Sequence, residues 1–192
     1  MNFPVHTLDS APAASHPSLQ ALQSAFGFIP NLVGAASSSP VLIGSLVELF
    51  GKVHGGSFTE AQIQILLLTN AVANESEWAV AFHSVLAVQH GIDAHDVQAI
   101  RSRNLPTEPT SAALSELARS LIEKRGRLGE SEAEAFLSAG FTREHLLEVI
   151  AVIAASTITN YAANVTRPPL EDKFSAQAWH AREVTSSRDD QR

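Results

Sequence analysis

Apolar positions along the 192-residue chain recur mostly at intervals of three and four, which is the period of an amphipathic α-helix. A helix of about four turns is expected in residues 40–56, because Pro40 suits a first helical turn and Gly55 with Gly56 suits a stop. No segment alternates convincingly as a strand does, so the pattern predicts an all-α protein. Shorter helical patterns cover residues 76–90, 93–103, 111–126 and 129–140.

Two of the expected helices are apolar around most of their circumference. Residues 59–75 follow Thr59, a candidate N-cap, and residues 142–166 end before Pro168. A helix without a broad polar face belongs in the middle of a fold. These two helices are therefore expected at the centre, and their apolar surface exceeds what one small domain covers.

The expected domain organisation is simple. Short loops separate the helical patterns, which favours one helical domain over residues 16–181. Residues 1–15 are expected to be a loose N-terminal segment and residues 182–192 a flexible tail.

Charge and composition exclude several classes of partner. Thirteen Lys and Arg against twenty Asp and Glu give a net charge of −7, and no large basic cluster exists, so nucleic acid is not an expected partner. The longest apolar stretch, LLEVIAVIAASTI, contains Glu148 and is shorter than the roughly 20 residues of a membrane span. The N-terminus lacks the pattern of a secretory signal, so we expect a cytoplasmic protein without membrane contact.

Metal, cofactor and nucleophile motifs are missing from the sequence. There is no cysteine, which removes thiolate chemistry and Cys-based metal sites. His83 and His90 lie about 10.5 Å apart along one helix axis, too far to share an ion. The chain contains no GxSxG elbow and no P-loop. No metal and no cofactor are expected.

His83 is the remaining candidate, on a helix whose other residues are small or apolar. Ser76 lies two turns away on the same face, beyond the contact that activation of a hydroxyl requires. From these residues alone, a half-buried histidine satisfied by packing is favoured over a catalyst. No Arg or Lys is clearly placed for a carboxylate, although Arg101, Arg103 and Arg167 stand near helix ends.

The stretch NESEWAVAFHSVLAVQHGID resembles the active helix of alkylhydroperoxidase D-like proteins in the carboxymuconolactone decarboxylase superfamily. The pattern of that helix is Asn-x-Cys-x-Tyr-Cys-x-x-x-His. Asn74 and His83 match its ends, Trp78 stands at the aromatic position, and Ser76 and Ala79 stand at the two cysteines. Both redox cysteines are therefore replaced.

Three further features extend the resemblance to about residues 20–175. Gln64 stands twelve residues before Ser76, where the family usually has a glutamate of its proton relay. FGFIPNLVGAASSSPVLIGSL resembles the opening segment of the family, and AGFTREHLLEVIAVIAASTITNYAAN with PPLEDKF resembles its closing helix and tail. The resemblance implies an all-helical AhpD-like fold with a central helical hairpin, assembled as a trimer or hexamer.

Two functions of different class follow from the resemblance. The first is a non-catalytic homo-oligomer that binds a small molecule or a protein partner and has no thiol peroxidase activity. The second is a lyase or isomerase in which His83 is the general acid or base on a small carboxylic or lactone substrate. By family position, the catalytic candidates are His83, Gln64 and Ser76, and the binding candidates are Trp78, Asn74 and Ala79.

The side chain of His83 has an expected orientation. Ser76, Val80, His83 and Ala87 form one stripe of helical spacing, and the helix with Gln64 is the natural surface for it to face. We expect a pocket there, with Gln64 and Ser76 in reach and with a neutral imidazole at pH 7.

Overall fold

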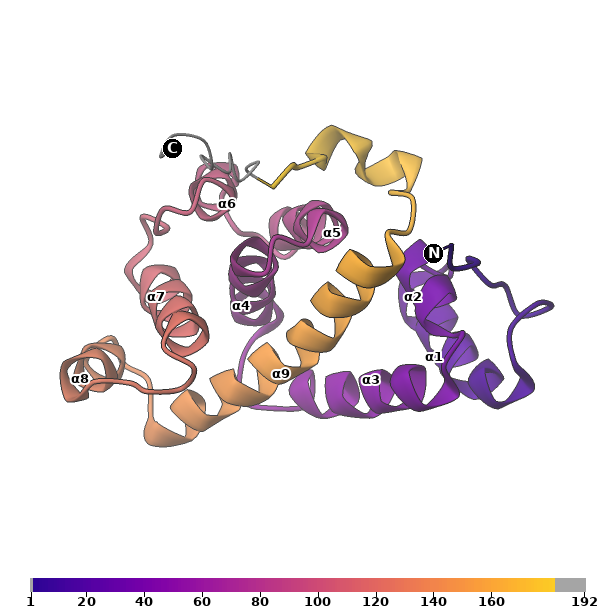
Figure 1. Ribbon diagram of the computed structural model, residues 1–192. Coiled ribbons are helices and arrows are strands. Elements are labelled where there is room, and N and C mark those ends of the chain that lie inside the picture. The colour runs from indigo at the N-terminus through magenta and orange to yellow at the C-terminus, as the bar shows by residue number, and fades with distance from the viewer. Residues whose placement is uncertain (1, 182–192) are drawn as a thin grey trace, which may run out of the picture.

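The structure is a computed structural model that describes residues 2–181, and all of its regular elements in this range are helices. The all-α prediction is confirmed (Figure 1). The elements are η1 (Ala13–Ser15), α1 (His16–Phe26), α2 (Asn31–Ala36), α3 (Pro40–Val53), α4 (Glu60–Ala73), α5 (Glu77–Gln89), α6 (Ala94–Arg101), α7 (Pro109–Glu123), α8 (Glu130–Ser138), α9 (Arg143–Thr166) and η2 (Asp172–Gln177).

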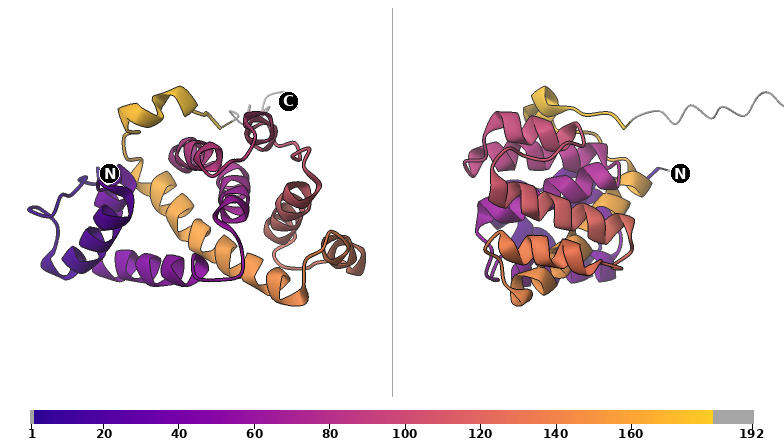
Figure 2. Two further views of the ribbon diagram at one scale, coloured as in Figure 1. Left: turned by 180° about the vertical axis from the view of Figure 1, so that it is seen from behind. Right: turned by 90° about the vertical axis from the view of Figure 1, so that its left-hand side faces the viewer.

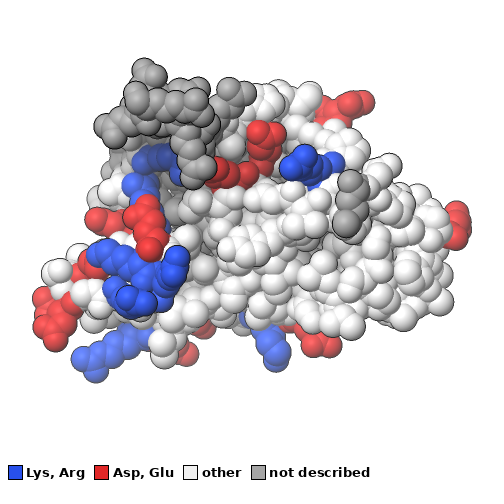
Figure 3. Space-filling model, viewed as in Figure 1, with Lys and Arg blue, Asp and Glu red and all other residues white. Residues whose placement is uncertain are grey.

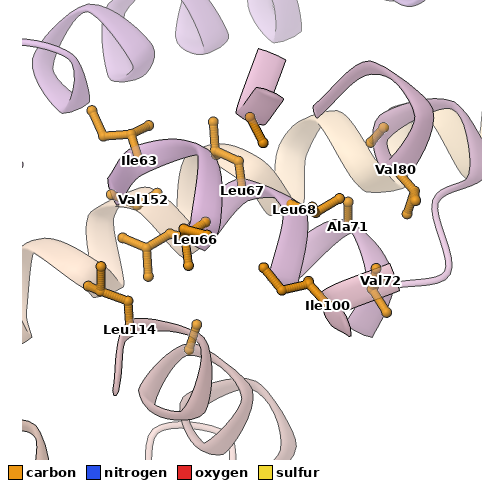
Figure 4. Close-up of a cluster of buried hydrophobic side chains, with 14 of the residues drawn as sticks. Ile63, Leu66, Leu67, Leu68, Ala71, Val72, Val80, Ile100, Leu114 and Val152 are labelled. Carbon is orange, nitrogen blue, oxygen red and sulfur yellow. The ribbon is translucent and has the colours of Figure 1, made fainter. Parts of the chain in front are cut away.

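Helix α4 is the centre of the fold, as its apolar circumference predicted. Every residue from Ile63 to Val72 is buried, and α4 packs against α5, α7 and α9 (Figure 1). Figure 4 shows Leu66 of α4 among side chains from neighbouring helices, including Leu114 and Val152. Burial of such side chains stabilises the fold by about 1.5–3 kcal/mol each.

The helix starts follow their capping residues. Thr59 Oγ1 accepts a hydrogen bond from the Gln62 backbone N–H, and the Gln62 side chain accepts one from the Thr59 N–H, which forms a capping box. Asp93 caps α6 by accepting from the His95 backbone N–H at 2.7 Å. The predicted N-cap Thr59 is confirmed.

Helix α9 runs diagonally across the molecule and contacts α2, α3, α4 and α5 (Figures 1 and 2). It has 24 residues, and by length and composition alone it could cross a membrane. Core helices of globular proteins meet the same criteria, and α9 packs on six other helices here, since it also contacts α7 and α8. One of its faces is buried, whereas only 33% of its most apolar 18-residue window is covered.

The N-terminal region contains two helices that were not predicted from the sequence, α1 and α2. Gly27 and Pro30 interrupt the apolar pattern between them. They form a second apolar cluster with α3 that includes Leu19, Val33 and Ile43.

The segment expected to be loose makes defined contacts with these helices. Ser15 is buried, and its Oγ donates to the Ser37 carbonyl at 2.7 Å. A Cβ at Gly34 would lie 2.7 Å from the His6 carbonyl oxygen, so the backbones approach closely where only glycine fits. The predicted flexible tail, residues 182–192, lies outside the described residues.

Candidate functional site

The helical hairpin of α4 and α5 positions the candidate residues. A three-residue connection joins the helices, with Asn74 ending α4 and Ser76 beginning α5. Glu75 between them adopts a left-handed backbone conformation with φ of 53°, and the Ser76 N–H donates to the Ala71 carbonyl at 3.0 Å. The tight connection brings the two helices side by side at the centre of the fold (Figure 1).

His83 and Gln64 meet across this hairpin as expected. His83 Nδ1 and Gln64 Oε1 are 3.0 Å apart, and both side chains are buried. Because Oε1 only accepts hydrogen bonds, the neutral ring carries its proton on Nδ1. Burial, with a smaller effect from the charge of His54, lowers the pKa of the His83 imidazole to about 3. The expected neutral state of His83 at pH 7 agrees with this pKa.

His83 is only 5% exposed. Val80 and Ala87 on the same stripe are fully buried, and the Phe82 ring packs edge-on at 5.2 Å between centroids. Three hollows on the described part of the chain are lined by other residues, so none of them is the expected pocket. In this chain the His83–Gln64 pair is a buried contact between two helices.

Ser76 and Ala79 occupy the positions that resemble the family's two cysteines. Both are fully buried, and Ser76 Oγ has no hydrogen-bond partner among the described residues. Ser76 and His83 lie seven residues apart on α5, about 10.5 Å along its axis. The structure therefore brings His83 to Gln64 and does not bring Ser76 to His83.

Asn74 and Trp78 join the hairpin to other parts of the chain. The Asn74 carbonyl accepts a hydrogen bond from Asn164 Nδ2 of α9 at 2.9 Å. Trp78 Nε1 donates to Glu171 Oε2 at 2.9 Å, which ties α5 to the C-terminal segment. These two residues, expected to bind a ligand, make structural contacts within the fold.

Glu171 was not singled out from the sequence, yet it connects three regions. Its second carboxylate oxygen accepts the Asn31 N–H at 2.7 Å, at the first turn of α2. The adjacent element η2 places Phe174 against the Phe82 ring, with centroids 5.3 Å apart. The segment PPLEDKF was the available signal, because it contains an acidic residue and an aromatic residue next to two prolines.

Arg101 also holds the C-terminal segment. Its Nη1 donates to Ser84 Oγ at 2.8 Å and to the Gln177 carbonyl at 3.0 Å, and its Nη2 donates to the Ala178 carbonyl. Burial lowers the pKa of the guanidinium, which remains charged. Among the described residues, no group of three or more His, Asp or Glu side chains is placed to hold a metal ion.

Comparison with solved structures identifies the fold. An uncharacterised peroxidase-related protein from Ralstonia eutropha JMP134, described as an alkylhydroperoxidase AhpD core, is 19% identical with a TM-score of 0.79, over 90% of this chain and 93% of that one. A peroxidase-related protein from Silicibacter sp. TM1040 is 15% identical with a TM-score of 0.76, over 92% and 94%. The chain has the alkylhydroperoxidase D-like fold.

A third AhpD-like neighbour is the debrominase Bmp8, in a cysteine-to-alanine variant bound to 2,3,4-tribromopyrrole. It is 15% identical with a TM-score of 0.74, over 92% of this chain and 95% of that one. No family model and no curated protein matches the sequence. The fold implied by the resemblance, with its central hairpin, is confirmed, and this AhpD-like chain contains no cysteine.

The hydrogen bond from Trp78 to Glu171 should contribute measurably to the stability of this AhpD-like fold. We expect Trp78→Phe to lower the free energy of unfolding by about 2 kcal/mol or more, because the acceptor is a carboxylate. Trp179→Phe is the matched control, since Trp179 Nε1 donates to the neutral Arg101 carbonyl, and it should cost about 1 kcal/mol. Urea unfolding measures both, and an equal cost would contradict the structural role of Glu171.

Proposed function

We propose that this AhpD-like chain is a homo-oligomeric binding protein without thiol peroxidase activity, in which the former reactive hairpin is a structural element. The buried His83–Gln64 contact carries this proposal, because it fills the position of a proton relay with a neutral imidazole and a neutral amide. The carboxylate and both thiols of the family pattern are absent from the sequence. The remaining His83–Gln64 contact packs α5 against α4.

Peroxidase assays test the negative part of the proposal. Reduction of a hydroperoxide by the family chemistry needs one thiolate to attack and a second to resolve the product. We therefore expect hydroperoxide consumption with a dithiol reductant to equal the rate without protein. Turnover that disappears in a Ser76→Ala variant would contradict the proposal, since Ser76 stands at the first cysteine position.

The alternative is a lyase or isomerase that uses His83 as its base, on a fold that a debrominase shares. A general base works best with a pKa near the working pH, and the pKa of His83 is about 3. His83 is also only 5% exposed, so little of it is accessible to a substrate. Enzyme activity lost specifically in a His83→Gln variant would establish this alternative.

The exposed face of α9 supports the proposed self-association. Leu147, Ile150, Tyr161 and Val165 are 65%, 45%, 58% and 65% exposed. Together with Ala154 and Ile158 they form a seam that recurs every three or four residues, which is the spacing of a helix–helix contact. Residues 149–166 contain no Asp, Glu, Lys or Arg, and the surface over α9, α2 and α3 is largely uncharged (Figure 3).

A second copy of the chain is the occupant that fits this seam. The seam is symmetric about residue 156, so two antiparallel copies of α9 would place Leu147 beside the partner's Val165 and Ala154 beside the partner's Ile158. An apolar groove of about 410 Å³ next to Tyr161 and Val165 could receive the partner's Leu147.

The charges at the helix ends agree with the antiparallel arrangement. Exposed Glu144 in the first turn of α9 would lie beside the partner's Arg167, which ends the same helix. Antiparallel packing also opposes the two helix dipoles. A two-fold contact of this kind produces a dimer or an even-numbered ring such as the hexamer that the resemblance implies, and it does not by itself produce a trimer.

A further inference from the structure

A small cavity lies on the side of α4 that faces away from the His83–Gln64 pair. It has a volume of about 130 Å³ and is formed by α4, α6 and α7. Thr69 of α4 lines it, and five residues of helix separate Thr69 from Gln64, a rotation of about 140°. The cavity is therefore independent of the hairpin site and of the α9 seam.

Part of the cavity lining is aliphatic. Val72, Ile100 and Ile122 contribute aliphatic side chains from three different helices. Water gains few hydrogen bonds against such surfaces, whereas a short hydrocarbon chain is stabilised by about 0.8 kcal/mol for each buried methylene group. The volume equals that of roughly four water molecules in the liquid, which suits a ligand of a few heavy atoms.

Two arginines complete the lining. Arg103 follows α6 in a left-handed conformation with φ of 64°, a position that usually takes glycine, and its Nη2 pairs with Glu75 Oε1 at 2.7 Å. Its remaining N–H groups are available to a ligand. Arg119 of α7 is half-buried and has no ion-pair partner within residues 2–181.

The surroundings of the cavity are basic in an otherwise acidic chain. A neighbouring hollow is lined by Lys124, Arg125 and Arg127, and it shares Glu123 with the cavity. Figure 3 shows Lys and Arg gathered over this edge of the molecule, at α7. The lining itself has two arginines and one glutamate, and Glu75 neutralises Arg103, so Arg119 is the lining cation without an ion-pair partner among the described residues.

We propose that this cavity binds a small monocarboxylate with a short aliphatic chain. The carboxylate would pair with Arg119 and with the free N–H groups of Arg103, where the fork of a guanidinium matches two oxygens. The aliphatic chain would lie against Val72, Ile100 and Ile122. Arg119, which has no ion-pair partner among the described residues, suits a monoanion, and Glu123 disfavours a dianion such as phosphate.

Calorimetric titration of the full chain with butyrate, butyramide and inorganic phosphate tests the ligand class. Butyramide has the shape of butyrate without its charge, and phosphate has the charge without the chain. Butyrate should bind at least about 10-fold more tightly than either, a difference of about 1.4 kcal/mol. Equal binding of butyrate and butyramide, tighter binding of phosphate, or no binding of butyrate at about 10 mM would each overturn the proposal.

Two variants locate the binding in the cavity. Arg119→Gln removes the charge and Ala73→Leu fills the space at the last turn of α4, and each should weaken butyrate binding at least about 10-fold. Arg127→Gln removes a charge from the neighbouring hollow only, and should keep the affinity within about 2-fold. Unchanged affinity in both cavity variants would refute the site.

The butyrate titration and the test of the proposed oligomer can fail independently of each other. The cavity lies within one copy of the chain, so its affinity for butyrate should be the same in the assembled protein and in a dissociated variant of the α9 seam. Circular dichroism of each variant confirms that the helices are retained.

Discussion

Acid should destabilise the wild-type protein more steeply than a His83→Gln variant. The pKa of His83 is about 3 in the folded protein against 6.5 in the unfolded chain, so below pH 6.5 the unfolded state binds a proton that the folded state does not. Stability from this group is therefore complete above pH 6.5 and falls as the pH is lowered toward 3. Between about pH 7 and about pH 5 the loss should be about 2 kcal/mol.

The measurement compares how steeply the free energy of unfolding changes with pH in each protein, rather than its value at one pH. His83→Gln removes a buried contact and lowers stability at every pH, but its free energy of unfolding should change about 2 kcal/mol less across this interval. His90→Gln is the control, because His90 is exposed at the end of the same helix, and its slope should equal that of the wild type. Equal slopes for all three proteins would show that His83 titrates normally and is not sealed in the core.

A glutamate in place of Gln64 would change the charge at this contact and should raise the pKa of His83. In Gln64→Glu the new carboxylate would face His83 Nδ1 at hydrogen-bond distance, where a negative charge stabilises the imidazolium. With the neutral Gln64 in its place, the buried His83 has a hydrogen-bond acceptor but no negative charge beside it, so the imidazole stays neutral. Glutamine has an amide nitrogen where glutamate has a second carboxylate oxygen. At position 64 this difference decides whether His83 faces a charged partner or a neutral one.

Residue spacing was sufficient to predict the long helices and the contact between His83 and Gln64. Both depend on local periodicity: α4 and α9 have the apolar circumference that predicted them, and the stripe with His83 was expected to face the helix that carries Gln64. Caps at Thr59 and Asp93 depend on a few neighbouring atoms and were predictable for the same reason.

Contacts between distant segments could not be predicted in this way. Nothing local to Trp78 indicates that Glu171, 93 residues later, accepts its N–H. Whether there is open space beside His83 depends on Phe82 and on the C-terminal segment. Phe82 packs against the His83 ring, and Phe174 of the C-terminal segment packs against the Phe82 ring. Arg103 and Arg119 meet at a cavity only because α6 and α7 both pack on α4.

Two charges placed in the α9 seam should dissociate the proposed oligomer. We expect the wild-type chain of 20.5 kDa to sediment as a multiple of that mass at micromolar concentration. In the double variant Leu147→Glu with Val165→Glu, the antiparallel pairing would bring like charges together in an apolar contact. The dissociation constant should rise at least about 100-fold, or about 2.7 kcal/mol. Both positions are largely exposed, so the fold of each copy should be retained.

A charge reversal at one of the two positions tests the antiparallel register itself. In Leu147→Glu with Val165→Lys, each new carboxylate would lie beside a new ammonium of the partner, so this variant should associate more tightly than the double glutamate variant by about 10-fold or more. Leu105→Glu is the matched control, because Leu105 is an exposed leucine outside α9, and it should leave the mass unchanged. A wild-type monomer would refute self-association. Equal dissociation of the two double variants would refute the antiparallel register and leave α9 in contact with its partner by another arrangement.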